Sequence, residues 1–198
     1  MNVRIQYTAT FTAGIYHDDL LRMNHYTIKL WMMTNCVDSL SQSIAFERIK
    51  HFIYGKLDST IFINSEHQEA CSRLAAAGLD ITTMPGDPVD QLIGIMLFYK
   101  LNAIMEDRIL IVETEIGSEF GEGIIYLHSD QENTDLKDIS PWWTDPAPIH
   151  HDVDPLTNDK VVAMHKVGAW RELDLAWPDT DAPTPEDNTV PFTDFVKK

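Results

Sequence analysis

The chain has 198 residues, a formal net charge of −16 at pH 7 and 44% hydrophobic residues. A charge this negative disfavours nucleic acids and anionic membrane surfaces as partners, because like charges repel each other. The sequence also lacks any apolar run near the roughly 18–20 residues that span a bilayer, so we expect no membrane partner.

Apolar side chains alternate with polar ones in two segments near the N-terminus, residues 3–11 and 26–32. This period of two predicts two half-buried strands. Residues 14–24 are expected to form the connection between them. That connection carries a group of polar side chains, namely His17, Asp18, Asp19 and Arg22.

Three helices are predicted in the middle of the chain. Residues 46–56 carry apolar side chains at helical spacing, and residues 66–77 form a shorter helix that a glycine follows. Pro88 suits the first turn of a longer, largely apolar helix. Compact apolar segments at 109–112 and 124–127 predict two further strands, so the element order indicates an α+β fold with antiparallel strand pairs.

Short motifs in a fixed order narrow the choice of fold. They are Phe11-Thr-Ala-Gly-Ile15, Asn24-His-Tyr-Thr-Ile-Lys-Leu30, Thr34-Asn-Cys-Val-Asp38, Leu57-Asp58 with Phe62-Ile63-Asn64, Asp87-Pro-Val-Asp-Gln91, and Val112-Glu113-Thr114 followed by Tyr126. In order and spacing this set resembles the tunnelling-fold (T-fold) family of 6-pyruvoyl-tetrahydropterin synthase and 6-carboxytetrahydropterin synthase.

The resemblance implies that residues 1–128 form a T-fold domain, with a four-stranded antiparallel sheet and two long helices on one face. Subunits of this family join sheet to sheet into an oligomeric β-barrel around a tunnel, which removes exposed sheet edges. Their ligand sites lie between subunits. The resemblance therefore implies a symmetric homo-oligomer.

Glu113 is the strongest candidate site residue that the resemblance implies. In the family this glutamate accepts hydrogen bonds from the amino-pyrimidinone edge of a pterin. A carboxylate suits the task, because its two oxygens pair with two parallel N–H donors. Thr114 is a second candidate for binding a pterin or purine-like ring. Glu115 is a rival to Glu113, since it lies two residues on and points to the same face of a strand.

The zinc site of the family is expected to be lost. The three zinc-binding histidines correspond to Ile15, Arg22 and Asn24, none of which binds zinc well. A shifted site that uses His17 and His25 with Asp18 or Asp19 is a second, weaker interpretation. We therefore expect no metal site and no cofactor.

The catalytic relay of the family is also incomplete. Asp58 remains as the candidate catalytic residue, but Ser59 occupies the place of its histidine partner. Serine does not act as a base near neutral pH without an activator. A local capping or hydrogen-bonding role is therefore the competing interpretation of Asp58.

Residues 129–198 differ in composition and are predicted to form an acidic, proline- and tryptophan-rich C-terminal arm. The arm holds 15 Asp and Glu against 6 Lys and Arg, a net charge of 6 − 15 = −9. Its four tryptophans suggest that it docks on the core or on a neighbouring subunit. A helix at 159–173 is possible, and the cluster at 150–154, with two histidines and two aspartates, is expected to be solvated.

Three functional hypotheses follow. The first is a divergent, zinc-free member that binds a pterin or purine-like ring without synthase activity. The second is a non-catalytic oligomer with a structural or assembly role. The third is a lyase with altered chemistry that uses Asp58, Glu113 and a histidine. The two cysteines, Cys36 and Cys71, fit no metal or redox spacing, which favours free thiols and a cytoplasmic location.

Overall fold

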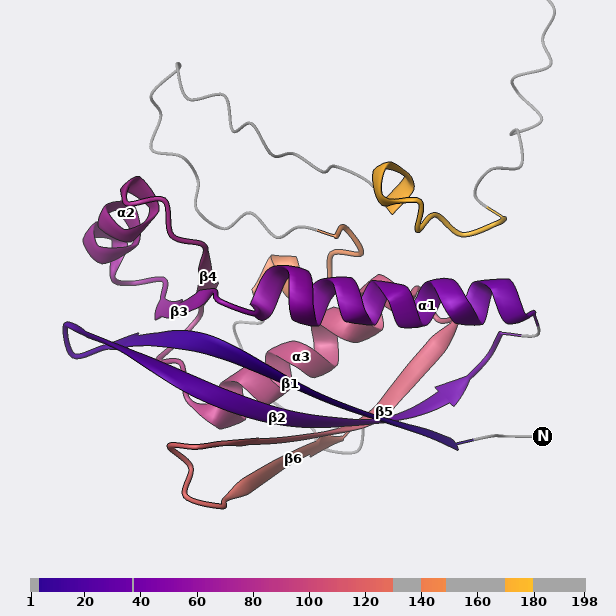
Figure 1. Cartoon of the computed structure of the whole chain (residues 1–198), viewed down its shortest axis with the longest axis horizontal. Coiled ribbons are helices and arrows are strands. Elements are labelled where there is room, and N and C mark those ends of the chain that lie inside the picture. The colour runs from indigo at the N-terminus through magenta and orange to yellow at the C-terminus, as the bar shows by residue number, and fades with distance from the viewer. Residues whose placement is uncertain (1–3, 37, 130–139, 149–169, 180–198) are drawn as a thin grey trace, which may run out of the picture.

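The computed structural model describes residues 4–36, 38–129, 140–148 and 170–179. Six strands form one mixed sheet in the order β4-β3-β1-β2-β5-β6, and helices cover one of its faces (Figure 1). The α+β class predicted from the element order is confirmed. The strands are β1 (Arg4–His17), β2 (Leu20–Thr34), β3 (Ile61–Asn64), β4 (Ile81–Met84), β5 (Ile109–Ser118) and β6 (Ile125–Ser129).

The predicted four-stranded antiparallel sheet was wrong in strand number and in type. The four predicted strands do lie side by side as β1, β2, β5 and β6, and each neighbouring pair is antiparallel. However, β3 pairs with β1 in parallel, and β4 pairs with β3 in parallel. These two strands have only four residues each, and all four residues of β3 are buried. Such short segments show no alternation that would reveal a strand.

The predicted connection at residues 14–24 was also wrong, because β1 and β2 run on to a two-residue turn. Asp18 and Asp19 form this turn with φ angles of 50° and 59°. Two residues at positive φ are typical of the tight turn that matches the twist of a hairpin, and aspartate tolerates this backbone region. As a result Arg22 pairs with Ile15 across the two strands.

The helices are α1 (Ser39–Phe52), α2 (Gln68–Ala76) and α3 (Asp90–Met105). Helix α1 begins earlier than predicted because Asp38 caps it, accepting a hydrogen bond of 2.7 Å from the Ser41 amide. A π-helical turn, η1 (Ile53–Leu57), follows it. Helix α3 is buried on most sides between α1 and β5, which explains its apolar composition.

The main core is an apolar cluster between the sheet and helices α1 and α3, and a second, smaller cluster packs α2 against β3 and the end of β1. Tryptophans from the C-terminal part of the chain complete the main core, namely Trp142, Trp143, Trp170 and Trp177. Two short 3-10 helices, η2 (Pro141–Trp143) and η3 (Trp170–Leu173), carry three of them. The predicted docking through tryptophans therefore occurs within one chain. The cluster at 150–154 and most of the possible helix at 159–173 lie outside the described residues. No helix in the described ranges combines the length and apolarity needed to cross a membrane.

Candidate functional site

Glu113 lies on β5 and faces away from the helices. It pairs with Trp31 of β2, and the register between these strands shifts directly after Trp31. This irregularity places an extra residue, Val112, between the buried Ile111 and Glu113. A bulge of this kind re-aims the side chains that follow it. Glu113 and Glu115 are thereby both directed to the open face of the sheet.

Glu115 already has partners on that face. Its Oε1 accepts a hydrogen bond of 2.9 Å from the Trp31 indole, and its Oε2 pairs with the Lys29 ammonium at 2.9 Å. The Trp31 hydrogen bond, followed by the Lys29 hydrogen bond, holds the pKa of the Glu115 carboxyl below its usual value. Both oxygens are engaged, so Glu115 is poorly placed to receive a ligand.

Glu113 is in the opposite situation. Its side chain is half-buried, yet it makes no hydrogen bond or ion pair with another residue in the described parts of the chain. The half-buried ring of Trp31 lies on the paired strand beside it. A free carboxylate next to an aromatic wall has the composition of a site for a polar-edged ring.

The side chains of Thr114 and Glu113 point to opposite faces of the sheet. The Thr114 side chain points to the helix-covered side, where it is 1% exposed. Its hydroxyl has no hydrogen-bond partner among the described residues. A role of Thr114 in ligand binding stays a prediction.

Asp58 follows the π-helical turn and accepts a hydrogen bond from strand β1. Its Oδ1 accepts from the Thr12 amide at 2.9 Å, and the Thr12 hydroxyl lies 3.1 Å from the Nδ1 of His25. These contacts tie Asp58 to β1, far away in the sequence, and are not the local capping or hydrogen bond that competed with catalysis in the sequence interpretation. A catalytic role of Asp58 stays a prediction.

Two adjoining hollows lie at the end of the sheet where β1 and β2 form their hairpin and α3 begins. Their volumes are about 300 and 360 Å³, and both are lined by Ile15, Pro88, Val89 and Phe120. Sequence reasoning missed Phe120 as a lining residue. The only available signal was its place in the glycine-punctuated segment between two predicted strands, which is weak evidence for a side-chain role.

The three positions that the resemblance assigns to zinc ligands meet at these hollows. Ile15 and Arg22 line the first, and Ile15 and Asn24 line the second. They do not fit zinc, since isoleucine offers no donor atom and the guanidinium of Arg22 is cationic.

The shifted metal site is not assembled either. His17 lies 3.4 Å from Asp18 and 3.8 Å from Asp87, whereas His25 contacts Thr12. Across the described ranges, no three His, Cys, Asp or Glu side chains gather in a way that would hold a metal ion.

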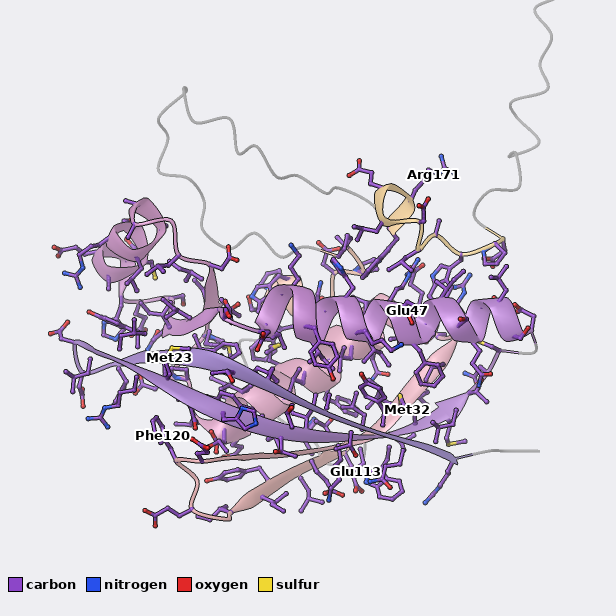
Figure 2. All side chains as sticks on the ribbon, in the orientation of Figure 1. Met23, Met32, Glu47, Glu113, Phe120 and Arg171 are labelled. Atoms are coloured by element: carbon purple, nitrogen blue, oxygen red, sulfur yellow. The ribbon has the colours of Figure 1, made fainter. Side chains whose placement is uncertain are left out.

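Within the described chain the candidate residues occupy separate places. Neither Glu113 nor Asp58 lines the hollows at the hairpin end. Figure 2 shows Glu113 and Phe120 at different positions along the sheet. A site that combines Glu113 with the hollows would need a second subunit.

Comparison with known proteins shows the fold but no closer relationship. No family model matches the chain, and no curated protein matches it significantly. An uncharacterized protein from Wolinella succinogenes has the same fold, with a TM-score of 0.50, 10% identity, and coverage of 66% of this chain and 99% of that one. At this identity the match shows the fold alone.

Two further matches are 6-pyruvoyl tetrahydropterin synthases. The Plasmodium vivax protein aligns with a TM-score of 0.42 and 12% identity, covering 65% of this chain and 97% of that one. The Plasmodium falciparum protein aligns with a TM-score of 0.39 and 13% identity, covering 64% and 96%. With TM-scores below 0.5, these two likenesses are too distant to carry an argument about this chain.

Proposed function

We propose that the protein is a divergent T-fold protein that binds a pterin or purine-like ring between subunits, without zinc-dependent synthase activity. One observation carries the proposal. Of the two carboxylates that β5 presents on the open face, Glu115 is saturated by Lys29 and Trp31, whereas Glu113 has no partner in the described parts of the chain.

The chemistry of such a ring matches what Glu113 offers. A pterin or guanine presents two parallel N–H donors along one edge, and a carboxylate accepts both with charge assistance. The Trp31 side chain provides an apolar surface beside this carboxylate. The absence of zinc chemistry rests on Ile15, Arg22 and Asn24, which replace the metal-binding residue types at the matching positions.

Sheet edges support the proposed assembly. Strand β6 is the last strand of the sheet, and apolar side chains are exposed there: Ile125 and Leu127 in the strand, and Ile124 directly before it. The edge of β1 that faces away from β2 is also partly free. Strand β1 pairs with β3 only over residues 14–16, so the first half of β1 has no described strand beside it on that edge. Unpaired edges of this kind favour strand addition from another subunit.

Calorimetric titration with neopterin, guanine and related purines tests the proposal. We expect micromolar binding to the wild type, that is, about −8 kcal/mol. Glu113→Gln keeps the shape but removes the charge and one acceptor, and it should weaken binding by roughly 1.5–3 kcal/mol. Glu119→Gln is the matched control, because it makes the same change at an exposed position on the following loop.

The outcome also distinguishes the other hypotheses. Loss of binding in Glu115→Gln but not in Glu113→Gln would assign the site to the rival carboxylate. No binding by any ring, with an intact oligomer, would contradict the proposal and leave a structural role. Weaker binding by Thr114→Val or by Asp58→Asn would add that residue to the site.

A further inference from the structure

Arg22 is a cation without an acceptor at the hairpin end. Its side chain lines the first hollow, and it makes no ion pair or hydrogen bond with another described residue. The nearby carboxylates, by contrast, have donors of their own. Asp18 and Asp87 lie beside His17, and the Asp87 carboxylate also accepts from the Asn64 amide at 3.1 Å.

A second donor without an acceptor lies beside it. Asn24 is two residues further along β2 and therefore on the same face, about 7 Å from Arg22 along the strand. The side chain of Asn24 is 1% exposed and lines the second hollow. Its Oδ1 accepts from the Phe120 amide at 3.3 Å, while its Nδ2 donor makes no hydrogen bond of good geometry in the described parts of the chain, although the buried Tyr26 hydroxyl interacts with the same side chain. A buried donor left unpaired costs free energy, so this one favours a ligand oxygen.

The start of helix α3 adds to the same preference. Pro88 and Val89 line both hollows, and Val89 is the N-cap residue but provides no side-chain hydrogen bond. Helix N-termini carry partial positive charge and favour acceptor oxygens. The carboxylate in the first turn of α3, Asp90, is engaged by the Ser118 hydroxyl at 2.6 Å.

The remaining walls are apolar and open to solvent. Leu20, Val89 and Phe120 are each more than half exposed, although all three line the first hollow. Exposed apolar side chains gathered around a concavity mark a binding site more often than an ordinary surface. Such walls suit a flat, apolar ligand body.

We propose that this hollow binds a small planar molecule that carries one carboxylate, with Arg22 and Asn24 as its hydrogen-bond donors. A guanidinium binds a carboxylate through two parallel hydrogen bonds. Four carboxylates, Asp18, Asp87, Asp90 and Glu122, also line the two hollows, and the first three are engaged by donors of their own. They repel a doubly charged phosphate about twice as strongly as a singly charged carboxylate, because Coulomb repulsion scales with ligand charge. The inference stands apart from the ring-binding role of Glu113, which lines neither hollow.

Fluorine NMR with 4-fluorobenzoate and its neutral analogue 4-fluorobenzamide tests the proposal on the full chain. We expect the benzoate to bind with a dissociation constant on the order of 1 mM, as suits so small a ligand. The benzamide and the variant Arg22→Gln should each bind roughly tenfold more weakly. Arg22→Lys should recover part of the affinity, because it keeps the charge but not the planar fork.

Arg4→Gln is the matched control, since it removes the same charge at the opposite end of the same hairpin and should leave binding unchanged. Glu113→Gln should also leave benzoate binding unchanged, which separates this site from the ring-binding site. Equal binding of benzoate and benzamide, or full binding by a folded Arg22→Gln, would overturn the proposal. Tighter binding of phenyl phosphate than of the benzoate would overturn the assignment to a carboxylate.

Discussion

The guanidinium carbon of Arg48, on α1, lies 3.8 Å from the ring centre of Trp177, which belongs to the C-terminal part of the chain. Glu106 joins the two residues, because its Oε1 accepts from Arg48 Nη1 at 2.7 Å and from the Trp177 indole at 2.8 Å. The ring of Trp170 contacts the same guanidinium at 4.5 Å. The C-terminal part of the chain is thus held to the helices by a buried cation between aromatic rings.

Arg48→Ala should therefore reduce the free energy of unfolding by roughly 3 kcal/mol, since it removes a buried guanidinium that donates to the partly exposed Glu106 carboxylate and to the backbone carbonyls of Ile104 and Leu175. Arg48→Lys should recover only a small part, because an ammonium lacks the planar stacking surface. Urea denaturation followed by tryptophan fluorescence measures both. Lys50→Ala is the control on the same helix, where the half-exposed pair with Glu47 should contribute less than about 1 kcal/mol.

The Glu115 carboxyl should make stability depend on pH in the acid range. Its folded-state pKa lies below the usual value, so its contribution is present above the unfolded-state pKa of about 4.3 and is lost as pH falls through the folded-state value. Glu115→Gln should be about 1 kcal/mol less stable than the wild type at pH 7. That difference should shrink as pH falls below about 4.3. Denaturation curves between neutral and acid pH check this, and a difference that stays constant with pH would contradict it.

Helix α3 should tolerate no side chain at Gly94. A Cβ at this position would lie 2.8 Å from the Cγ2 of Ile116 on β5. Gly94→Ala should therefore lower stability by about 1–3 kcal/mol through overpacking, despite the better helix propensity of alanine. Gly55→Ala is the helical control, because its Cβ would meet only the His51 ring at 3.4 Å, an ordinary contact. A thermal melt in which both variants behave alike would refute the close packing of α3 on β5.

The exposed edge of β6 should govern self-association. Leu127 is 56% exposed and lies on the open face opposite Glu115. Leu127→Lys places a charge beside the edge, a device that natural sheets use to prevent strand addition. We expect an oligomer for the wild type and smaller species for the variant, measured by size-exclusion chromatography with light scattering. A monomeric wild type at micromolar concentration would contradict the proposed assembly.

Local pattern was sufficient for the longer elements of the fold. The alternation in residues 3–11 and 26–32 predicted β1 and β2, and the apolar segment after Pro88 predicted α3, because burial on one or all sides leaves a periodic trace in the sequence. The local sequence pattern did not predict β3 and β4. A four-residue buried strand has no readable period, and its pairing depends on residues far away in the chain.

By itself, the sequence determined the α+β class and the main strands and helices. Only the tertiary structure decided which carboxylate of β5 is free and which polar groups meet at the hairpin end. The reason is that Glu113 and Glu115 are chemically identical and lie on the same face of β5. What separates them is the position of Lys29 and Trp31 on the neighbouring strand, which strand register sets.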